Sequence, residues 1–206
     1  MTGVTCRKNW QFSLRWNLMA AIYSPMRRIW PLSAIVSAEG AQLRQLLEMT
    51  DVAPNGRCID LGCGVGHSRE LVPAEAWVVG VDRSPRMARH AAAAGYRAVV
   101  LADIGQLPFA TNFDFALCIG VLEYVAAIDL FFRQVAAVLH ENGYFLCTIS
   151  PNTKITALRR RFGPFLYLHR PEQMIQWGED AGLRLVAQRY YLTQISFLFS
   201  KQCAAD

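Results

Sequence analysis

Short apolar runs alternate with helix-like segments between residues 57 and 149. The runs have the length of strands, and they are continuously apolar, as expected of parallel strands that are covered on both faces. Strands that alternate with helices in this way predict βαβ units and a mostly parallel sheet. The expected strands are Arg57 to Leu61, Trp77 to Asp82, Arg97 to Leu101, Phe113 to Ile119 and Tyr144 to Ile149.

Helices are expected between and beside these strands. Pro85 to Ala94 begins with a Ser84-Pro85 pair that suits a helix N-cap and first turn, and Gly95 ends it. The turn Glu141 to Gly143 leads into the fifth strand. The sequence thus predicts an α/β fold, a Rossmann-like three-layer sandwich with a mostly parallel seven-stranded sheet and an antiparallel C-terminal strand. The other expected helices are Ser33 to Met49, Ile128 to His140 and Pro171 to Ala181, and the closing antiparallel pair is Arg184 to Tyr190 with Gln194 to Ser200.

The distribution of charge divides the chain into two parts. A chain of 206 residues, 53% of them hydrophobic, suits one well-buried core. Residues 1–38 contain no acid and five basic side chains, which supply the whole net charge of +5. We therefore expect a basic, aromatic helical cap at residues 1–40 and one α/β domain at residues 41–206. The basic side chains are Arg7, Lys8, Arg15, Arg27 and Arg28.

A second acid-free stretch, Lys154 to Arg170, carries three consecutive arginines from Arg159 to Arg161 among aromatic and aliphatic residues. Basic and apolar side chains together suit an anionic membrane surface or an anionic apolar substrate. The alternative is that both stretches are the solvated faces of ordinary helices.

No apolar run near the N-terminus approaches the roughly 20 residues of a membrane span. Arg15, Arg27 and Arg28 also interrupt any secretory signal. A cytoplasmic location is therefore expected, with peripheral contact at the inner membrane face as a further option. The cysteines and histidines lack the spacing of a zinc-type nucleic-acid module, so no nucleic-acid partner is expected.

A glycine loop follows the first expected strand and is expected to open a helix. Its sequence from Asp60 to Gly66 is Asp-Leu-Gly-Cys-Gly-Val-Gly, and glycines in such a loop let a ligand approach the backbone closely. A tight strand-to-helix turn alone does not explain three alternating glycines after an aspartate. His67 stands where the dinucleotide-binding fingerprint has its third glycine, which argues against a nicotinamide-dependent oxidoreductase.

The D-x-G-x-G-x-G pattern from Asp60 to Gly66 resembles motif I of class I S-adenosylmethionine-dependent methyltransferases. Asp82 ends the second strand, where a carboxylate can accept hydrogen bonds from both ribose hydroxyls. Asp103 begins a D-x-x-x-L-P-F segment similar to the one that meets the adenine in this family. Ile119 to Val125 resembles the segment that lines the methionine side, although Tyr124 stands where family members often have histidine.

The resemblance covers about residues 41–201 and is strongest to the methyltransferase type 11 branch that contains quinone-biosynthesis enzymes. It implies S-adenosylmethionine as the cofactor, no metal, and a small apolar or lipid-like acceptor such as a quinol or a phospholipid. Asp82 read alone is equally consistent with a helix cap, and Asp103 with an ordinary loop acid. The residues implied to bind the cofactor are Asp60, Gly62, Gly64, Gly66, Asp82, Arg83, Asp103, Ile104 and Ile119.

The sulfonium already makes the methyl group electrophilic, so the protein mainly has to hold a nucleophile in line and exclude water. A dedicated base is not required. The candidates are His67, Glu123, Tyr124, His140 and His169, with His169 preferred because it lies in the variable segment after the fifth strand.

Several alternatives stay open at this point. Tyr23 and Arg27 stand where related enzymes place a tyrosine-containing helix over the cofactor, or else this helix only packs on the sheet through Trp10, Trp16 and Trp30. A non-catalytic protein that binds the cofactor would carry the same loops. Methylation of nucleic acid or protein is disfavoured, because no N/D-P-P-Y tetrapeptide follows the fourth strand.

Overall fold

A seven-stranded sheet forms the centre of the computed structural model, which describes residues 32–110, 113–153, 156–157 and 166–202. The strand order is β3-β2-β1-β4-β5-β7-β6. The strands from β3 to β5 in this order run parallel, and β7 is antiparallel to both of its neighbours. This confirms the predicted fold class. The strands are β1 (Arg57–Leu61), β2 (Trp77–Asp82), β3 (Ala98–Leu101), β4 (Phe113–Cys118), β5 (Leu139–Ile149), β6 (Leu183–Tyr190) and β7 (Ile195–Lys201).

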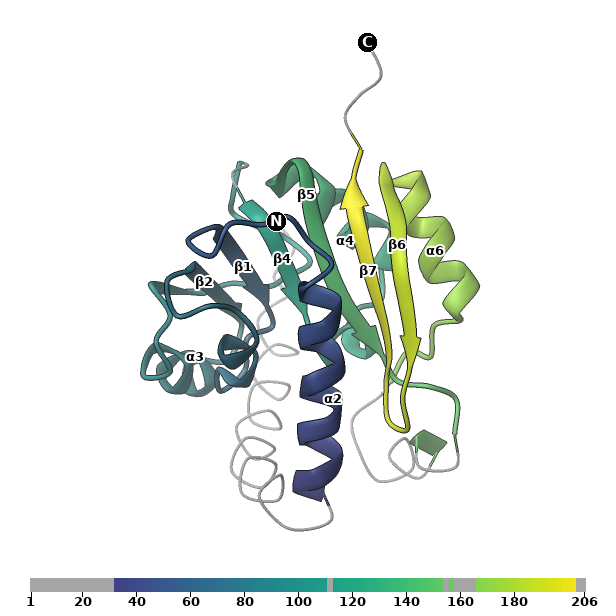
Figure 1. Cartoon of the computed structure of the whole chain (residues 1–206), viewed down its shortest axis with the longest axis horizontal. Helices are drawn as coiled ribbons and strands as arrows, with labels where there is room; N and C mark the ends of the chain where they lie inside the picture. Colours follow the sequence, from purple (N-terminus) through teal and green to yellow (C-terminus); the bar gives the residue numbers. More distant parts are fainter. Residues whose placement is uncertain (1–31, 111–112, 154–155, 158–165, 203–206) are drawn as a thin grey trace, which may run out of the picture.

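Helices cover both faces of the sheet (Figure 1). Helices α2 (Leu32–Leu47) and α3 (Pro85–Ala92) pack on one face, and α4 (Ile128–Val138) and α6 (Pro171–Asp180) pack on the other. Buried side chains of β4 alternate between the two core clusters, which explains why the strand is continuously apolar from Phe115 to Cys118. Phe115 and Leu117 join the cluster of α2 and α3, whereas Ala116 and Cys118 join that of α4 and α6.

Two segments differ from the sequence-based expectation. Strand β5 begins at Leu139, so the expected turn Glu141 to Gly143 lies inside the strand, where Asn142 has a φ of 63°. The reason is that Leu139 already pairs with Phe113 of β4, and the register then shifts before Phe115 pairs with Tyr144. The other expected boundaries agree with the structure to within one or two residues.

The chain after the glycine loop forms the short 3₁₀ helix η1 (His67–Leu71), where the sequence predicted the start of a longer helix. The guanidinium of Arg69 ends it by donating hydrogen bonds to the carbonyl oxygens of Val72, Pro73 and Ala74. These carbonyls are therefore satisfied without a further helical turn.

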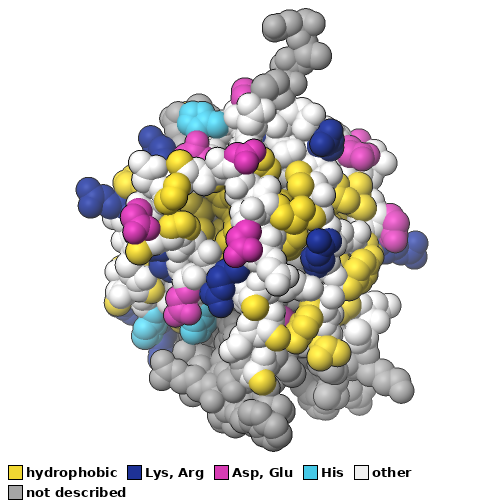
Figure 2. Space-filling model, viewed as in Figure 1, with side chains coloured by type: hydrophobic (Ala, Val, Ile, Leu, Met, Phe, Trp, Pro, Cys, Tyr) yellow, Lys and Arg dark blue, Asp and Glu magenta, His cyan; other side chains and the backbone are white. Residues whose placement is uncertain are grey.

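Much of the expected N-terminal cap lies outside the described residues, including Trp10, Trp16, Tyr23, Arg27 and Trp30, so its role stays a prediction. Within the described residues, no helix is long and apolar enough to cross a membrane. On the face drawn in Figure 2, basic and acidic side chains are interspersed around apolar ones. The basic excess of the sequence is therefore not visible as a block on this face of the described part.

Candidate functional site

A cavity of about 760 Å³ lies along the edge of the sheet where the parallel strands end. This is the edge at which open α/β sheets bind ligands, and the volume falls in the range of small-molecule sites, roughly 300–1,000 Å³. The chain that follows each of β1 to β5 contributes to its wall, and α2 and the loop before β7 complete it. The cavity thus extends from β3 at one end of the sheet edge to β7 towards the other.

The glycine loop forms the wall of the cavity next to β1. The backbone N–H groups of Gly62 and Cys63 donate to the Val81 carbonyl oxygen at 2.8 and 3.0 Å, which fixes the loop on β2. Gly64 has a φ of 54°, and a Cβ atom placed there would meet no atom closer than 3.9 Å. The left-handed φ favours a glycine here, and the open space beside it leaves room for a ligand to approach the backbone.

Gly66 has a different role from the one expected of it. A Cβ atom on Gly66 would lie 2.6 Å from Cβ of Ala94 and 3.1 Å from the ring of Tyr96. Gly66 is not part of the cavity wall, which contains Gly62 and Gly64. This third glycine of the motif lets the loop pack against the end of α3, and the structure does not support its predicted contact with a cofactor.

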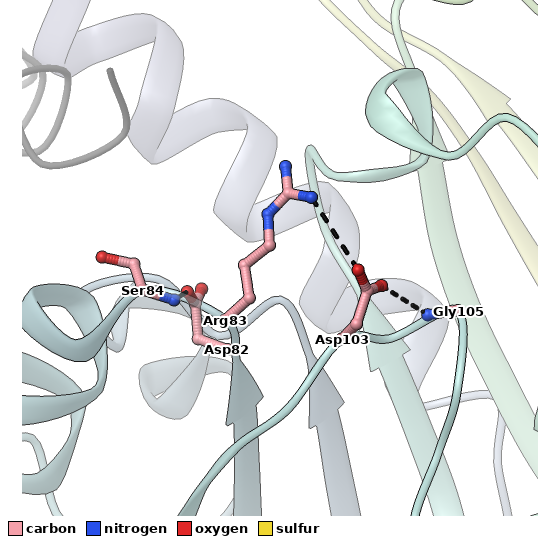
Figure 3. A network of polar contacts seen from close by, with 5 residues as sticks. All are labelled: Asp82, Arg83, Ser84, Asp103 and Gly105. Atoms are coloured by element: carbon pink, nitrogen blue, oxygen red, sulfur yellow. Dashed lines mark hydrogen bonds and ion pairs between the residues drawn. The ribbon is translucent and has the colours of Figure 1, made fainter. Parts of the chain in front are cut away.

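Asp82 joins two segments of the cavity wall. One carboxylate oxygen accepts a hydrogen bond from the Ser84 backbone N–H at 2.7 Å, and the other accepts one from Gly64 N–H at 3.0 Å. Figure 3 shows the first of these bonds. The N-cap of α3 is Ser84, whose hydroxyl accepts from Met87 N–H at 3.3 Å, so capping is not the role of Asp82.

The electrostatics of Asp82 reflect its half-buried position. Burial raises the pKa of its carboxyl group, while backbone hydrogen bonds from Ser84, Gly64 and Arg83 and the positive charge of Arg83 act in the opposite direction. A carboxylate can accept about four hydrogen bonds, so these backbone N–H groups do not use all of its acceptor capacity.

Arg83 and Asp103 stand on neighbouring loops of the same wall and point towards each other (Figure 3). The guanidinium and the carboxylate are 3.9 Å apart, and the other carboxylate oxygen of Asp103 accepts from Gly105 N–H at 2.9 Å. Because both side chains are exposed, this ion pair contributes little stability, about 0–1 kcal/mol. Ile104 and Ile119 also line the cavity, as expected.

Asp60, which the motif placed among the binding residues, lies behind the loop. It is only 1% exposed and is not part of the cavity wall. Its carboxylate accepts hydrogen bonds from the hydroxyls of Ser68 and Tyr96. Burial raises the pKa of Asp60 to about 6, although both hydrogen bonds lower it.

The candidate bases separate into two groups. His67, Glu123 and Tyr124 line the cavity, and Glu123 is buried there. His169 does not line the cavity, and its Nε2 lies 3.1 Å from the Leu122 carbonyl oxygen. The structure therefore gives no support to His169 as the preferred base. Its ring lies between Tyr167 and Trp177, and burial lowers its pKa. His140 lies near the start of β5, away from the edge that holds the cavity.

Sequence reasoning missed the part of the wall beyond β5. Glu39 and Arg44 of α2 line the cavity together with Ser150, Thr193 and Gln194. The Thr193 hydroxyl donates a hydrogen bond to the Glu39 carboxylate and thereby joins α2 to the loop before β7, across 154 residues of sequence. No local pattern in the sequence indicates a contact over this separation.

The central segment of the chain is similar to known proteins. Residues 59–147 match the family model of the methyltransferase domain. A malonyl-[acyl-carrier protein] O-methyltransferase from Legionella pneumophila is 34% identical over 123 residues, which cover 55% of this chain and 43% of the relative. A ubiquinone biosynthesis O-methyltransferase from Rhizobium etli is 35% identical over 112 residues, 50% of this chain and 44% of the relative. The matches thus span less than half the length of these relatives.

Solved structures share the fold across most of the chain. A methyltransferase from Thermotoga maritima, described as S-adenosylmethionine-dependent, superposes with a TM-score of 0.71 at 18% identity, covering 91% of this chain and 100% of that one. The magnesium protoporphyrin IX methyltransferase of Synechocystis, with bound S-adenosylhomocysteine, superposes with a TM-score of 0.69 at 17% identity, covering 93% and 100%. At these identities the superpositions establish the fold.

Proposed function

We propose that this chain, whose residues 59–147 match the family model of the methyltransferase domain, is an S-adenosylmethionine-dependent methyltransferase. The observation that carries the proposal is a cavity at the carboxyl edge of the sheet in which an open glycine backbone lies next to the carboxylate of Asp82. An adenosyl ligand offers two ribose hydroxyl donors, and Asp82 places on the cavity wall a carboxylate whose acceptor capacity the backbone N–H groups do not use up. The residues present therefore fit the cofactor.

The order of the strands supports a proposed position for each part of the cofactor along the wall. Asp82 would hold the ribose, and Asp103 with Ile104 would hold the adenine beside β3. Arg83 would cover the adenine, because a guanidinium stacks well on aromatic faces. Gly62, Gly64 and Ile119 would bound the methionine part. Asp60 and Gly66 support this wall from behind.

The bound cofactor would supply a methyl group on a positively charged sulfur. The chain would orient the acceptor molecule, exclude water from the site and provide a group that accepts a proton. Glu123 is buried, and the cavity wall also carries the apolar side chains of Val125 and Ile149, which disfavour water there. Glu123 would orient the acceptor hydroxyl and accept its proton, since a carboxylate is an acceptor when ionised.

The acceptor we propose is a small, largely apolar molecule that is methylated on oxygen, such as a quinol. The support is the mixed character of the cavity wall, which includes the apolar side chains of Leu130 and Ile149 as well as the carboxylates of Glu39 and Glu123. Both relatives named above are O-methyltransferases by name. Contact with an anionic membrane surface is proposed only for the basic stretches, most of which lie outside the described residues.

The first experiment is a calorimetric titration of the wild-type protein with S-adenosylmethionine, S-adenosylhomocysteine and NAD. Micromolar binding of both adenosyl ligands, about −8 kcal/mol, is expected together with no binding of NAD. A screen for transfer of labelled methyl groups then starts with quinols and continues with phospholipids. Binding of NAD without adenosyl binding would contradict the proposal, and adenosyl binding without transfer to any acceptor would favour a non-catalytic protein.

A further inference from the structure

Tyr96 connects the end of α3 with the back of the glycine loop. Its phenol hydroxyl donates a hydrogen bond of 2.5 Å to the Oδ2 atom of Asp60, across 36 residues of sequence. The Ser68 hydroxyl, in η1, donates to the same oxygen. Tyr96 is 8% exposed and Asp60 1% exposed, so water does not readily replace either contact.

Two glycines make room for the ring of Tyr96. A Cβ atom on Gly66 would lie 3.1 Å from its Cε2 atom, and a Cβ atom on Gly80 would lie 3.0 Å from its Cδ1 atom. The ring is therefore in close contact with the last turn of the glycine loop and with β2. The hydroxyl reaches Asp60 at the end of β1, so one side chain fixes β1, β2 and the loop relative to one another.

The hydrogen bonds at Asp60 are strongest when its carboxyl group is ionised. An ionised carboxylate only accepts, so its Oδ2 atom can receive both the Ser68 and the Tyr96 hydroxyl. A protonated carboxyl group still accepts hydrogen bonds, but bonds to a neutral acceptor are about half as strong as bonds to a charged one. Protonation of Asp60 therefore weakens both hydroxyl contacts.

No cation is among the groups that face Asp60 in the described part of the chain. These groups are the hydroxyls of Ser68 and Tyr96 and the carboxylate of Asp82, together with the thiols of Cys58, Cys63 and Cys118. The hydrogen bonds from the two hydroxyls favour the ionised form of this buried group. Cys63 lines the cavity, and burial, followed by the nearby carboxylate of Asp60, raises the pKa of its thiol.

We propose that Tyr96 is a positioning residue for the cofactor: acting with Ser68 on the ionised carboxylate of Asp60, it holds the glycine loop in the conformation that binds. This inference rests on the proposed function, because it concerns the affinity of the same site for its adenosyl ligand. Tyr96 does not line the cavity and acts only through Asp60 and the loop.

The direction of the pH dependence follows from the pKa of Asp60, which folding raises from 3.8 to about 6. As the pH falls through about 6, Asp60 takes up a proton, both hydroxyl contacts weaken, and the affinity for the cofactor declines. Folding stability has the opposite dependence, since a raised pKa favours the folded state at low pH and this contribution is lost as the pH rises through about 6. Removing the Tyr96 hydroxyl raises the pKa of Asp60 further, so the decline in affinity begins at a higher pH.

The test is calorimetric titration of S-adenosylhomocysteine between pH 5 and pH 8 into the wild type, Tyr96→Phe and Tyr144→Phe. Tyr144 is a matched control, because it is half-buried, packs on the same core cluster and lies outside the cavity wall. We expect Tyr96→Phe to bind about tenfold more weakly at pH 7, the effect of one hydrogen bond to a charged group. Its affinity midpoint should shift upwards by about one pH unit, and Tyr144→Phe should follow the wild type.

The possible outcomes separate this inference from the proposed function. Wild-type binding with an unchanged affinity and midpoint in Tyr96→Phe would overturn the role of Tyr96 alone. No binding to the wild type would overturn both proposals. If Tyr96→Phe fails to fold by circular dichroism, Ser68→Ala removes the other donor to Asp60 and must show the upward shift of the midpoint; an unshifted midpoint in that variant would also overturn the inference.

Discussion

Asp82→Ala is expected to weaken the binding of S-adenosylhomocysteine by at least about 100-fold. Hydrogen bonds to a charged group contribute about 1.5–3 kcal/mol each, and Asp82 would make two to the ribose. The substitution also removes the acceptor of the Gly64 N–H and the Ser84 N–H, so the glycine loop keeps only its backbone hydrogen bonds to Val81 at the end of β2. A loss of about 3 kcal/mol corresponds to slightly more than a factor of 100.

The measurement is calorimetric titration at pH 7.5, with Asp114→Ala as the matched control. Asp114 also accepts a hydrogen bond from a backbone N–H, that of Arg57 at 2.7 Å, but it lies near the start of β4, away from the cavity. The affinity of Asp82→Asn should lie between those of Asp82→Ala and Asp114→Ala, because an amide keeps one acceptor oxygen and loses the charge. An Asp82→Ala protein that binds like the wild type would remove the ribose contact and with it the main support for the cofactor site.

Strands β1 and β2 show what the sequence could predict. Both have the expected bounds, and in β2 the buried run from Val78 to Val81 is uninterrupted, as expected of a strand that is covered on both faces. The position of Asp82 on the cavity wall follows from the same reasoning, since parallel strands end at one edge. Strand β5 was less predictable, because its first residues pair with β4 before the polar turn residues, and that pairing depends on a strand far away in the sequence.

Motif I shows the limit of reasoning from spacing. Its aspartate and its third glycine lie behind the loop, whereas the first and second glycines face the cavity. The residues that decide this are Tyr96 and Ala94, which reach the loop from the end of α3. His169 illustrates the same limit, because its contact with Leu122 crosses 47 residues and turns it away from the cavity.

Gly66→Ala is expected to lower the free energy of unfolding by about 3 kcal/mol. A non-glycine residue at its φ of 94° costs about 1–3 kcal/mol. The added methyl group would also lie 2.6 Å from Cβ of Ala94 and 3.3 Å from Cα of Ala91, and overpacking of this kind costs about 1–3 kcal/mol. The end of α3 would have to move to accommodate it.

Gly64→Ala is the matched comparison, because it adds the same methyl group two residues earlier in the same loop. Its φ of 54° lies in the left-handed region, but no atom is closer than 3.9 Å to the new methyl group, so the loss of stability should be about 1 kcal/mol. The methyl group would instead occupy the cavity wall that faces the ligand, and the affinity for S-adenosylhomocysteine should fall by at least about tenfold.

Urea unfolding and calorimetric titration of both variants separate packing from binding. If Gly66→Ala unfolds like the wild type but loses the cofactor, the third glycine contacts the ligand after all, and its assignment to packing is wrong. If Gly64→Ala keeps full affinity, the ligand does not approach the loop at its second glycine. We expect a stability defect in Gly66→Ala and a binding defect in Gly64→Ala. These results would show that two glycines of one motif have different physical roles. The roles differ because Gly66 packs against Ala94 and Tyr96, whereas Gly64 faces the open cavity.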